Sequence, residues 1–330
     1  MTVRKPIALV LGVALVLLLP LGLFLGSVAL TPADVLAVLL GGGSEVQREI
    51  LLQFRLPRLL VGSILGGGLA LAGATFQALL RNPLAEPYIL GISGGAALGA
   101  VTVLALGLTT LGSWSLPLAA FAGALLAIVL VFRVATATGR ALDVRVLLLA
   151  GVVVGAFFAA VISFILAVSD ARTVRSAVLW MMGTLYGSAW SDVVVVAAYT
   201  LPTALLLMTL ARPLNTLSVG EETALYLGTE VERVKRIAFA AASLITAAGV
   251  AVAGVIGFVG LVVPHALRLV VGSDHRILLP LSFLLGAVFL TSADMAAQVL
   301  LTPTEIPIGV VTALVGVPIF LVLLRRSAFR

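Results

Sequence analysis

The chain contains no cysteine and only two histidines, His265 and His275, among its 330 residues. The absence of cysteine excludes disulfides, thiol nucleophiles and thiolate metal sites. The two histidines are ten residues apart and do not form a histidine metal motif by themselves. We therefore expect neither a metal site nor a cofactor on this chain.

Charge is also scarce, because Asp, Glu, Lys and Arg together make up 10% of the residues. The only lysines are Lys5 and Lys235, and no GxxxxGK[ST] phosphate-binding loop occurs. The chain cannot hold ATP through such a loop, so any energy must come from a partner or an ion gradient. The net charge of +6 would suggest nucleic acid in a soluble protein, but in a membrane protein basic residues orient the spans. We expect no nucleic-acid partner.

Hydrophobic residues are abundant, at 62%, and they form runs about as long as a bilayer is thick. The runs lie at 7–28, 59–80, 89–110, 114–132, 146–168, 193–211, 237–257, 277–293 and 307–324. No polar stretch between them is long enough to bury a core of its own. The sequence therefore predicts one transmembrane domain over residues 1–330. The first run is longer than the apolar part of a signal peptide, so we expect it to remain as a helix.

The stretch 237–271 would measure about 52 Å as a straight helix, too long for one span and too short for two full ones. Gly254, Gly257, Gly260 and Pro264 cluster in its middle. Glycine and proline interrupt helices, so we predict one full helix followed by a short helix that Pro264 limits. The predicted fold class is thus an all-α polytopic membrane protein with about ten transmembrane helices.

An even number of spans places both termini on the same side of the membrane. Five of the twenty basic residues then lie on the opposite side: Arg48, Arg55, Arg58, Arg172 and Arg175. The other fifteen share the side of the termini and include Arg4, Lys5, Arg140, Arg325, Arg326 and Arg330. By the positive-inside rule both termini are cytoplasmic.

A short sequence similarity between two parts of the chain supports an inverted repeat. Leu71–Gly73 and Val252–Gly254 are similar tripeptides, and each is followed ten residues after its glycine by a proline, Pro83 or Pro264. The two copies lie five spans apart, and an odd separation inverts one copy relative to the other. The sequence therefore predicts two halves of inverted topology.

Three segments between the runs each allow two interpretations. Arg55 and Arg58 flank Pro57 at a helix start on the outer side, and they either reach outward to lipid headgroups or bind an acidic partner. The segment 212–236 holds the only acidic cluster on the inner side, and it is either a solvated connector or a docking element. The segment 170–187 is amphipathic, and its Trp180 and Tyr186 suit the outer interface.

Two other functional classes remain open at this point. The motif GISG around Ser93 resembles the serine pattern of intramembrane proteases, with His265 as the possible base. Its glycines also suit plain helix packing, which we favour. A secondary transporter driven by an ion gradient is the second alternative. Asp294 is the only carboxylate within a predicted span, whereas such carriers usually bury several ionisable groups.

Five fragments together resemble the permease subunits of the bacterial ABC importers for iron–siderophores, haem and cobalamin. They are RLPR (55–58), LAGATFQALLRNPLAEP (71–87), the LG of ALYLG (227–228), GFVGLVVPHALR (257–268) and EIPIGVVTALVGVPIF (305–320). Their order and spacing make the resemblance specific, and it covers residues 50–326. It implies a non-enzymatic pore subunit in the bacterial cytoplasmic (inner) membrane, with ATP and Mg²⁺ held by a separate ATPase.

The resemblance also implies partners and sites. A second copy of the chain would complete the path, lined by the fifth and tenth helices with Gly151, Gly155, Ser163, Gly309 and Thr312. A dimer of cytoplasmic ATP-binding subunits would receive the segment that carries Gly220, Glu221, Ala224, Leu227 and Gly228. An extracytoplasmic substrate-binding protein would dock on Arg55 and Arg58. A further outer arginine of the family is Gln298 here, and the metal chelate carried is left open.

Overall fold

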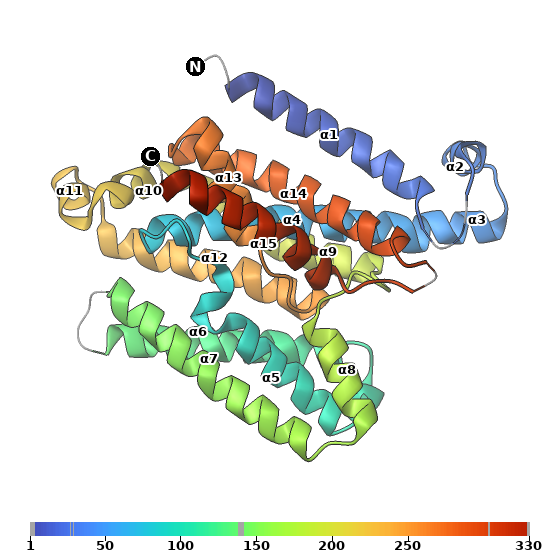
Figure 1. Ribbon diagram of the computed structural model, residues 1–330, viewed down its shortest axis with the longest axis horizontal. Coiled ribbons are helices and arrows are strands. Elements are labelled where there is room, and N and C mark those ends of the chain that lie inside the picture. The colour runs from blue at the N-terminus through green and yellow to red at the C-terminus, as the bar shows by residue number, and fades with distance from the viewer. Residues whose placement is uncertain (1–3, 27, 29, 138–141, 303, 329–330) are drawn as a thin grey trace.

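The computed structural model describes residues 4–26, 28, 30–137, 142–302 and 304–328, and throughout these ranges the regular elements are helices (Figure 1). The long helices are α1 (Arg4–Phe24), α4 (Leu56–Leu79), α5 (Ile92–Ala105), α6 (Ser115–Thr136), α7 (Val144–Ala167), α9 (Trp190–Thr209), α12 (Val231–Ala253), α13 (Val259–Val271), α14 (His275–Val299) and α15 (Ile308–Ala328). Seven of them are long and apolar enough to cross a membrane, and α5, α13 and the apolar part of α15 are shorter. The prediction of about ten spans is confirmed.

Short elements join the long helices. They are α2 (Pro32–Leu39), α3 (Glu45–Glu49), a π-helical turn η1 (Ile50–Arg55), the 3₁₀ turns η2 (Pro87–Leu90) and η3 (Leu108–Leu111), α8 (Ala171–Met181), α10 (Ala211–Val219) and α11 (Glu221–Tyr226). Helix α8 forms within the predicted amphipathic stretch, and Asp170 begins it by accepting the backbone N–H groups of Arg172 and Thr173.

Helix α4 is the centre of the molecule, and α9, α12, α13 and α14 pack around it. Of its most apolar 18 residues 89% are buried, against 11% for α1, which lies at the edge of the bundle (Figure 1). Small residues allow the close packing, since a Cβ added at Gly66 would lie 2.3 Å from the carbonyl oxygen of Gly286 in α14. This glycine-rich helix therefore connects most other parts of the structure.

The two halves of the chain repeat one pattern. In the first half the 24-residue α4 is followed by a break and the 14-residue α5, and in the second the 23-residue α12 is followed by a break and the 13-residue α13. These pairs are the second and third spans of their halves and lie five spans apart, as the inverted repeat predicts.

The position of one break differs from the prediction. The chain leaves the helical path at residues 254–258, beginning at Gly254 with its φ of 70°, but Pro264 lies inside α13 and does not limit it. The helix continues because the carbonyl that a proline leaves without its helical partner, on Gly260, accepts a hydrogen bond from Gln77 of α4.

The two ends of the chain lie at the same end of the bundle, as an even number of spans requires (Figure 1). The start of α1, the end of α15 and the pair α10–α11 lie at one end of the bundle, and α2 and α3 lie at the other (Figure 1). The first end is called the coupling end below and the second the outer end, after the roles that the sequence predicts for them. Two of the basic residues used to orient the chain, Arg140 and Arg330, lie outside the described residues.

Candidate functional site

Arg58 is the centre of a largely buried ionic cluster at the outer end. Its Nε and Nη2 donate to the two carboxylate oxygens of Asp294 at 2.8 and 2.9 Å, and its Nη1 and Nη2 donate to Glu305 at 3.1 and 2.8 Å. Four of the five guanidinium N–H donors are thus used. The side chains of Arg58, Asp294 and Glu305 are 12%, 3% and 24% exposed. The cluster ties α4 to α14 and to the segment that leads into α15.

Arg55 is also buried, and it acts on the backbone. Its guanidinium donates to the carbonyl oxygens of Leu23, in the last turn of α1, and of Val28, just beyond it. A cation at the C-terminus of a helix satisfies free carbonyls and opposes the helix dipole. Gly26 leaves room for the guanidinium, because a Cβ there would lie 2.8 Å from Nη2 of Arg55. Arg55 therefore fastens α1 to α4.

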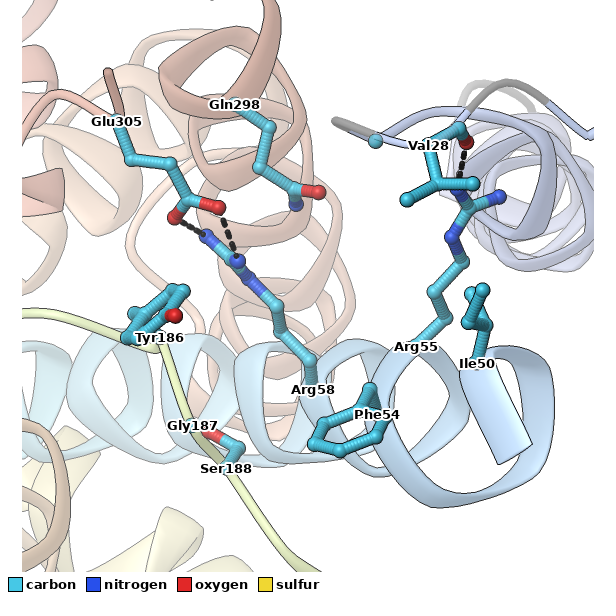
Figure 2. Close-up of a pocket in the computed structure, with 11 residues that line it drawn as sticks. Val28, Ile50, Phe54, Arg55, Arg58, Tyr186, Gly187, Ser188, Gln298 and Glu305 are labelled. Carbon is cyan, nitrogen blue, oxygen red and sulfur yellow. Dashed lines mark hydrogen bonds and ion pairs between the residues drawn. The ribbon is translucent and has the colours of Figure 1, made fainter. Parts of the chain in front are cut away.

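Both arginines line one outer pocket of about 370 Å³, together with Phe54, Tyr186 and Glu305. Figure 2 shows Arg58 turned toward Glu305 and Arg55 turned away toward Val28. Both guanidinium groups are bonded within the chain, and the side chain of Arg55 is buried while that of Arg58 is 12% exposed. Neither group therefore extends freely outward to lipid or to a partner. The docking of a binding protein on them stays a prediction.

Gln298, the residue expected to stand in place of a further outer arginine, joins this ionic cluster. Gln298 lies in the same pocket, and its amide Nε2 donates to Asp294 at 2.8 Å. Asp294 therefore accepts from both Arg58 and Gln298. The one carboxylate within a predicted span is thus held in a structural cluster, which argues against its use in coupling to an ion gradient.

The coupling end presents apolar side chains to the surface. Helices α10 and α11 form a corner in which Tyr226 is 92% exposed, and Val219, Leu225 and Leu227 are also exposed. Gly228 ends the corner with a φ of 77°, and its N–H and that of the next residue bond back to α11. We call Val219, Leu225, Tyr226 and Leu227 the apolar corner.

The predicted coupling residues divide between the surface and the interior. Leu227 and Gly228 are exposed, as an interface requires, whereas Ala224 is fully buried against the chain. Glu221 bonds inward, to the Nζ of Lys235 at 3.0 Å and toward Nη2 of Arg81 at 3.6 Å. The expectation that Ala224 contacts a partner is corrected, because its side chain is fully buried between α11 and the rest of the chain.

A second fastening holds the coupling end together. The amide of Asn215 in α10 donates to Asp274, and its carbonyl oxygen accepts from the backbone N–H of His275. Hydrogen bonds from Arg276 and from Asn215 hold the pKa of Asp274 well below its usual range. The carboxylate therefore stays ionised and keeps α10 against the start of α14.

The predicted path residues lie on α7 and α15. Gly151 packs on η2, where an added Cβ would be 2.7 Å from the carbonyl oxygen of Ile89. Gly309 packs on Met182, and Thr312 is fully buried with its hydroxyl bonded to the Gly309 carbonyl oxygen. These three residues pack within the chain, and their place on the translocation path stays a prediction.

Gly155 and Ser163 remain on more open parts of α7, partly buried and exposed respectively. Their place on the translocation path stays a prediction.

The protease alternative lacks its central contact. The ring of His265 is buried and packs edge-on against Phe320 of α15, with ring centroids 5.9 Å apart. In the described part of the chain no hydrogen bond joins that ring to Ser93. A nucleophile needs a base within hydrogen-bond reach, so the geometry does not favour this chemistry.

Sequence reasoning missed the residues that join the two breaks and most of the apolar corner. Gln77 and Glu86 are buried or partly buried polar residues at the breaks. Both could have been noticed in the sequence as polar side chains within an otherwise apolar motif. Tyr226 and Leu225 could have been found as apolar residues within the most polar inner segment.

Comparison with known proteins gives consistent matches. The sequence model of the FecCD transport family matches residues 14–326. The cobalamin import system permease protein BtuC of Halobacterium salinarum is 47% identical over 290 residues, 88% of this chain and 77% of that protein. The hemin transport system permease protein HmuU of Yersinia pestis is 39% identical over 287 residues, 86% and 85% of the two chains. A solved metal-chelate type ABC transporter in an inward-facing conformation superposes with a TM-score of 0.87 at 31% identity, over 98% of this chain and 99% of that one.

Proposed function

Because the chain belongs to the FecCD transport family, we propose that it forms the translocation path of an ABC importer as a homodimer and carries a metal chelate of the siderophore, haem or cobalamin class. The match over almost the whole chain carries this proposal, and the relatives named for cobalamin and hemin import support the substrate class. ATP and Mg²⁺ belong to a separate cytoplasmic ATPase. An extracytoplasmic binding protein delivers the substrate.

The apolar corner supports the ATPase as a partner. A side chain as exposed as Tyr226, in a water-facing segment, has a large apolar surface that burial in a partner would stabilise. Aromatic residues are also frequent among those that dominate binding energy at interfaces. The paired charges behind the corner hold it in place. We therefore assign the apolar corner, with Gly228, to the contact with the ATP-binding subunits.

The proposal is tested by reconstitution. The purified chain is placed in vesicles with the binding protein and the ATPase encoded beside its gene, and uptake of cobalamin, haem and a ferric siderophore is measured. We expect uptake of one class that requires ATP and survives a proton ionophore. Uptake that collapses with the ionophore and persists without ATP would instead identify a secondary transporter. The mass of the purified permease in detergent tests the homodimer.

Orientation is tested by labelling, which is simple in a chain without cysteine. Thr223, in α11, and Glu45, in α3, are both exposed and lie at opposite ends of the bundle. If the coupling end is cytoplasmic, a membrane-impermeant thiol reagent applied outside labels Glu45→Cys and spares Thr223→Cys. The opposite result would invert the topology.

A further inference from the structure

We propose that Gln77 and Glu86 are positioning residues that lock the two interrupted helices together, and that this joint transmits movement of α11 to α15. The joint consists of residues 81–91, residues 254–258 and these two side chains. It lies where the breaks of the two halves meet. The inference rests on the proposed function, because it concerns how ATP hydrolysis on a partner acts on the path.

Gln77 repairs the helix that Pro264 interrupts. Pro264 has no N–H, so the carbonyl of Gly260, four residues earlier, loses its helical donor. The side-chain Nε2 of Gln77 lies 3.3 Å from that oxygen and 3.3 Å from the carbonyl oxygen of Leu261. An unsatisfied carbonyl at this depth is costly, because lipid and packed apolar side chains offer no donor. The position of α13 therefore depends on α4.

The same side chain also holds the first break. Its Nε2 is 3.3 Å from the carbonyl oxygen of Ala85, and its Oε1 accepts from Nη1 of Arg268 at 2.9 Å. Gln77 is 3% exposed. Nearby, a Cβ at Gly73 would be 1.9 Å from the carbonyl oxygen of Gly260, so only glycine permits this approach of α4 to α13. The Gln77 amide thus contacts both breaks from one point.

Glu86, which lies in the first break, binds the backbone of the second break. Its Oε1 accepts the backbone N–H of Phe258 at 2.7 Å, at the start of α13, and the hydroxyl of Tyr88 accepts the N–H of Ile256 at 3.3 Å. A carboxylate at a helix N-terminus is favoured by free N–H groups and by the helix dipole. Phe258 has a φ of 68°, a conformation that a bulky residue adopts only when its surroundings impose it.

The carboxylate of Glu221 links the coupling end to the joint. Glu221 of α11 pairs with Arg81, the residue at which the first break begins, and with Lys235 near the start of α12. Helix α12 leads directly into the second break. A displacement of α11 therefore acts on both breaks at once.

Helix α15 rests on the other side of the joint. A Cβ added at Gly316 would lie 2.7 Å from the side chain of Phe258, and one at Gly309 would lie 2.9 Å from the carbonyl oxygen of Val255. The edge-on contact between His265 and Phe320 adds a third point. Tightly packed contacts of this kind do not deform gradually, so a shift of 254–258 must move α15.

The experiment separates positioning from simple stabilisation. Glu86→Leu removes the acceptor at Phe258, and Glu86→Gln keeps a side-chain oxygen that can accept. Each variant is reconstituted with the ATPase and the binding protein, and the number of substrate molecules taken up per ATP hydrolysed is measured beside the thermal unfolding temperature in detergent. We expect Glu86→Leu to lower uptake per ATP at least tenfold and Glu86→Gln to remain within about twofold of wild type.

The matched control is Thr75→Val in α4, two residues before Gln77. The Thr75 hydroxyl is buried and donates only to the Leu71 carbonyl oxygen of its own helix, so its loss does not touch either break. Thr75→Val should change the unfolding temperature without changing uptake per ATP. If Glu86→Leu also changes only the unfolding temperature, the joint is structural and the proposal is wrong.

A second variant and a measurement on the wild-type chain complete the test. If Glu86→Leu does not fold, Tyr88→Phe removes only the hydroxyl that accepts the Ile256 N–H, and it should lower uptake per ATP by about two- to fivefold. Unchanged uptake per ATP in Tyr88→Phe would then overturn the proposal. The wild-type chain tests the proposed function separately. Absence of any ATP-driven uptake by the wild type would disprove the importer and, with it, the transmitting role of the joint.

Discussion

The outer and coupling ends of the molecule differ in the side chains that we assign to their partners. At the outer end Arg55 is buried and Arg58 is largely buried, both are bonded within the chain, and aromatic and polar groups line the pocket beside them. At the coupling end the charges of Glu221 and Lys235 pair inward, and Tyr226 extends into the solvent. The arginines assigned to the outer partner are thus already bonded within the chain, whereas the residues assigned to the coupling partner form an exposed apolar surface.

This difference separates two ways of meeting a partner. An exposed apolar side chain gains free energy as soon as a partner covers it, with no bond to break first. A buried ion pair can accept a partner only by exchanging one of its own members, so its net gain is small. We therefore expect strong, geometry-dependent contact at the coupling end and weak, salt-dependent contact at the outer end.

The largest effect should come from removing the outer cation. Arg58→Met leaves Asp294 buried and without its main partner, so we expect a loss of about 3–5 kcal/mol in the free energy of unfolding. Denaturant unfolding of the purified chain in detergent measures it. The control is Arg175→Met, an exposed outer arginine, which should change stability by less than about 0.5 kcal/mol. A loss below about 1 kcal/mol for Arg58→Met would mean that the cluster is open to solvent.

The next effect concerns the coupling end. Tyr226→Ser should weaken association with the ATP-binding subunits by about 2 kcal/mol, or roughly thirtyfold, with little change in folding because the side chain touches so little of its own chain. Binding of the purified ATPase to the detergent-solubilised permease measures this. Tyr186→Ser is the matched control, because Tyr186 is 73% exposed at the outer end and should leave ATPase affinity unchanged. Equal losses for both variants would contradict the assignment of the apolar corner.

A smaller effect is expected at the turn that ends the corner. Gly228 has a φ of 77° with open space around it, so Gly228→Ala should cost about 1 kcal/mol of conformational strain and tilt α11. Gly107, with a φ of 66° and open space at the end of α5, is the control. Both variants should lose similar stability, but only Gly228→Ala should lower the ATPase activity that the binding protein stimulates. Equal activity in the two would place Gly228 outside the coupling contact.

The sequence predicted the helices better than their contacts. Apolar runs and glycine-proline clusters report what one segment needs, and they located the long helices and the break before α13. They could not report that Gln77 supplies the donor Pro264 lacks, because those residues are far apart in the chain. The sequence therefore marked Pro264 as the end of a helix that in fact continues past it.

The same limit explains the outer arginines. Their position against the charge rule was correctly noticed, but the rule does not identify the partners that neutralise them. Asp294 and Glu305 reach Arg58 from 236 and 247 residues away. Glu305 was predicted only as part of a motif, and Asp294 only as an isolated carboxylate. Long-range pairing of this kind depends on the packing of α4 against α14, which local patterns do not contain.

The smallest effect should appear where docking competes with the chain's own carboxylate. Glu305 is the more exposed of the two partners of Arg58, so it is the one an incoming carboxylate can replace at least cost. Glu305→Gln weakens that internal pair and leaves Asp294 in place. We therefore expect the affinity for an acidic binding protein to rise by up to about fivefold, an exposed pair being worth roughly 0.2–1 kcal/mol.

Docking of the purified binding protein to the reconstituted transporter across a salt series measures this change, which should be greatest at low ionic strength because salt screens exposed charges. Glu45→Gln, an exposed carboxylate in α3 outside the pocket, controls for the general change in surface charge. A lower affinity for Glu305→Gln would mean that Glu305 itself binds a basic group of the partner. An affinity that matches the control at low salt would mean that Arg58 only holds α4, α14 and the start of α15 together, and that docking depends on the uncharged rim of the pocket.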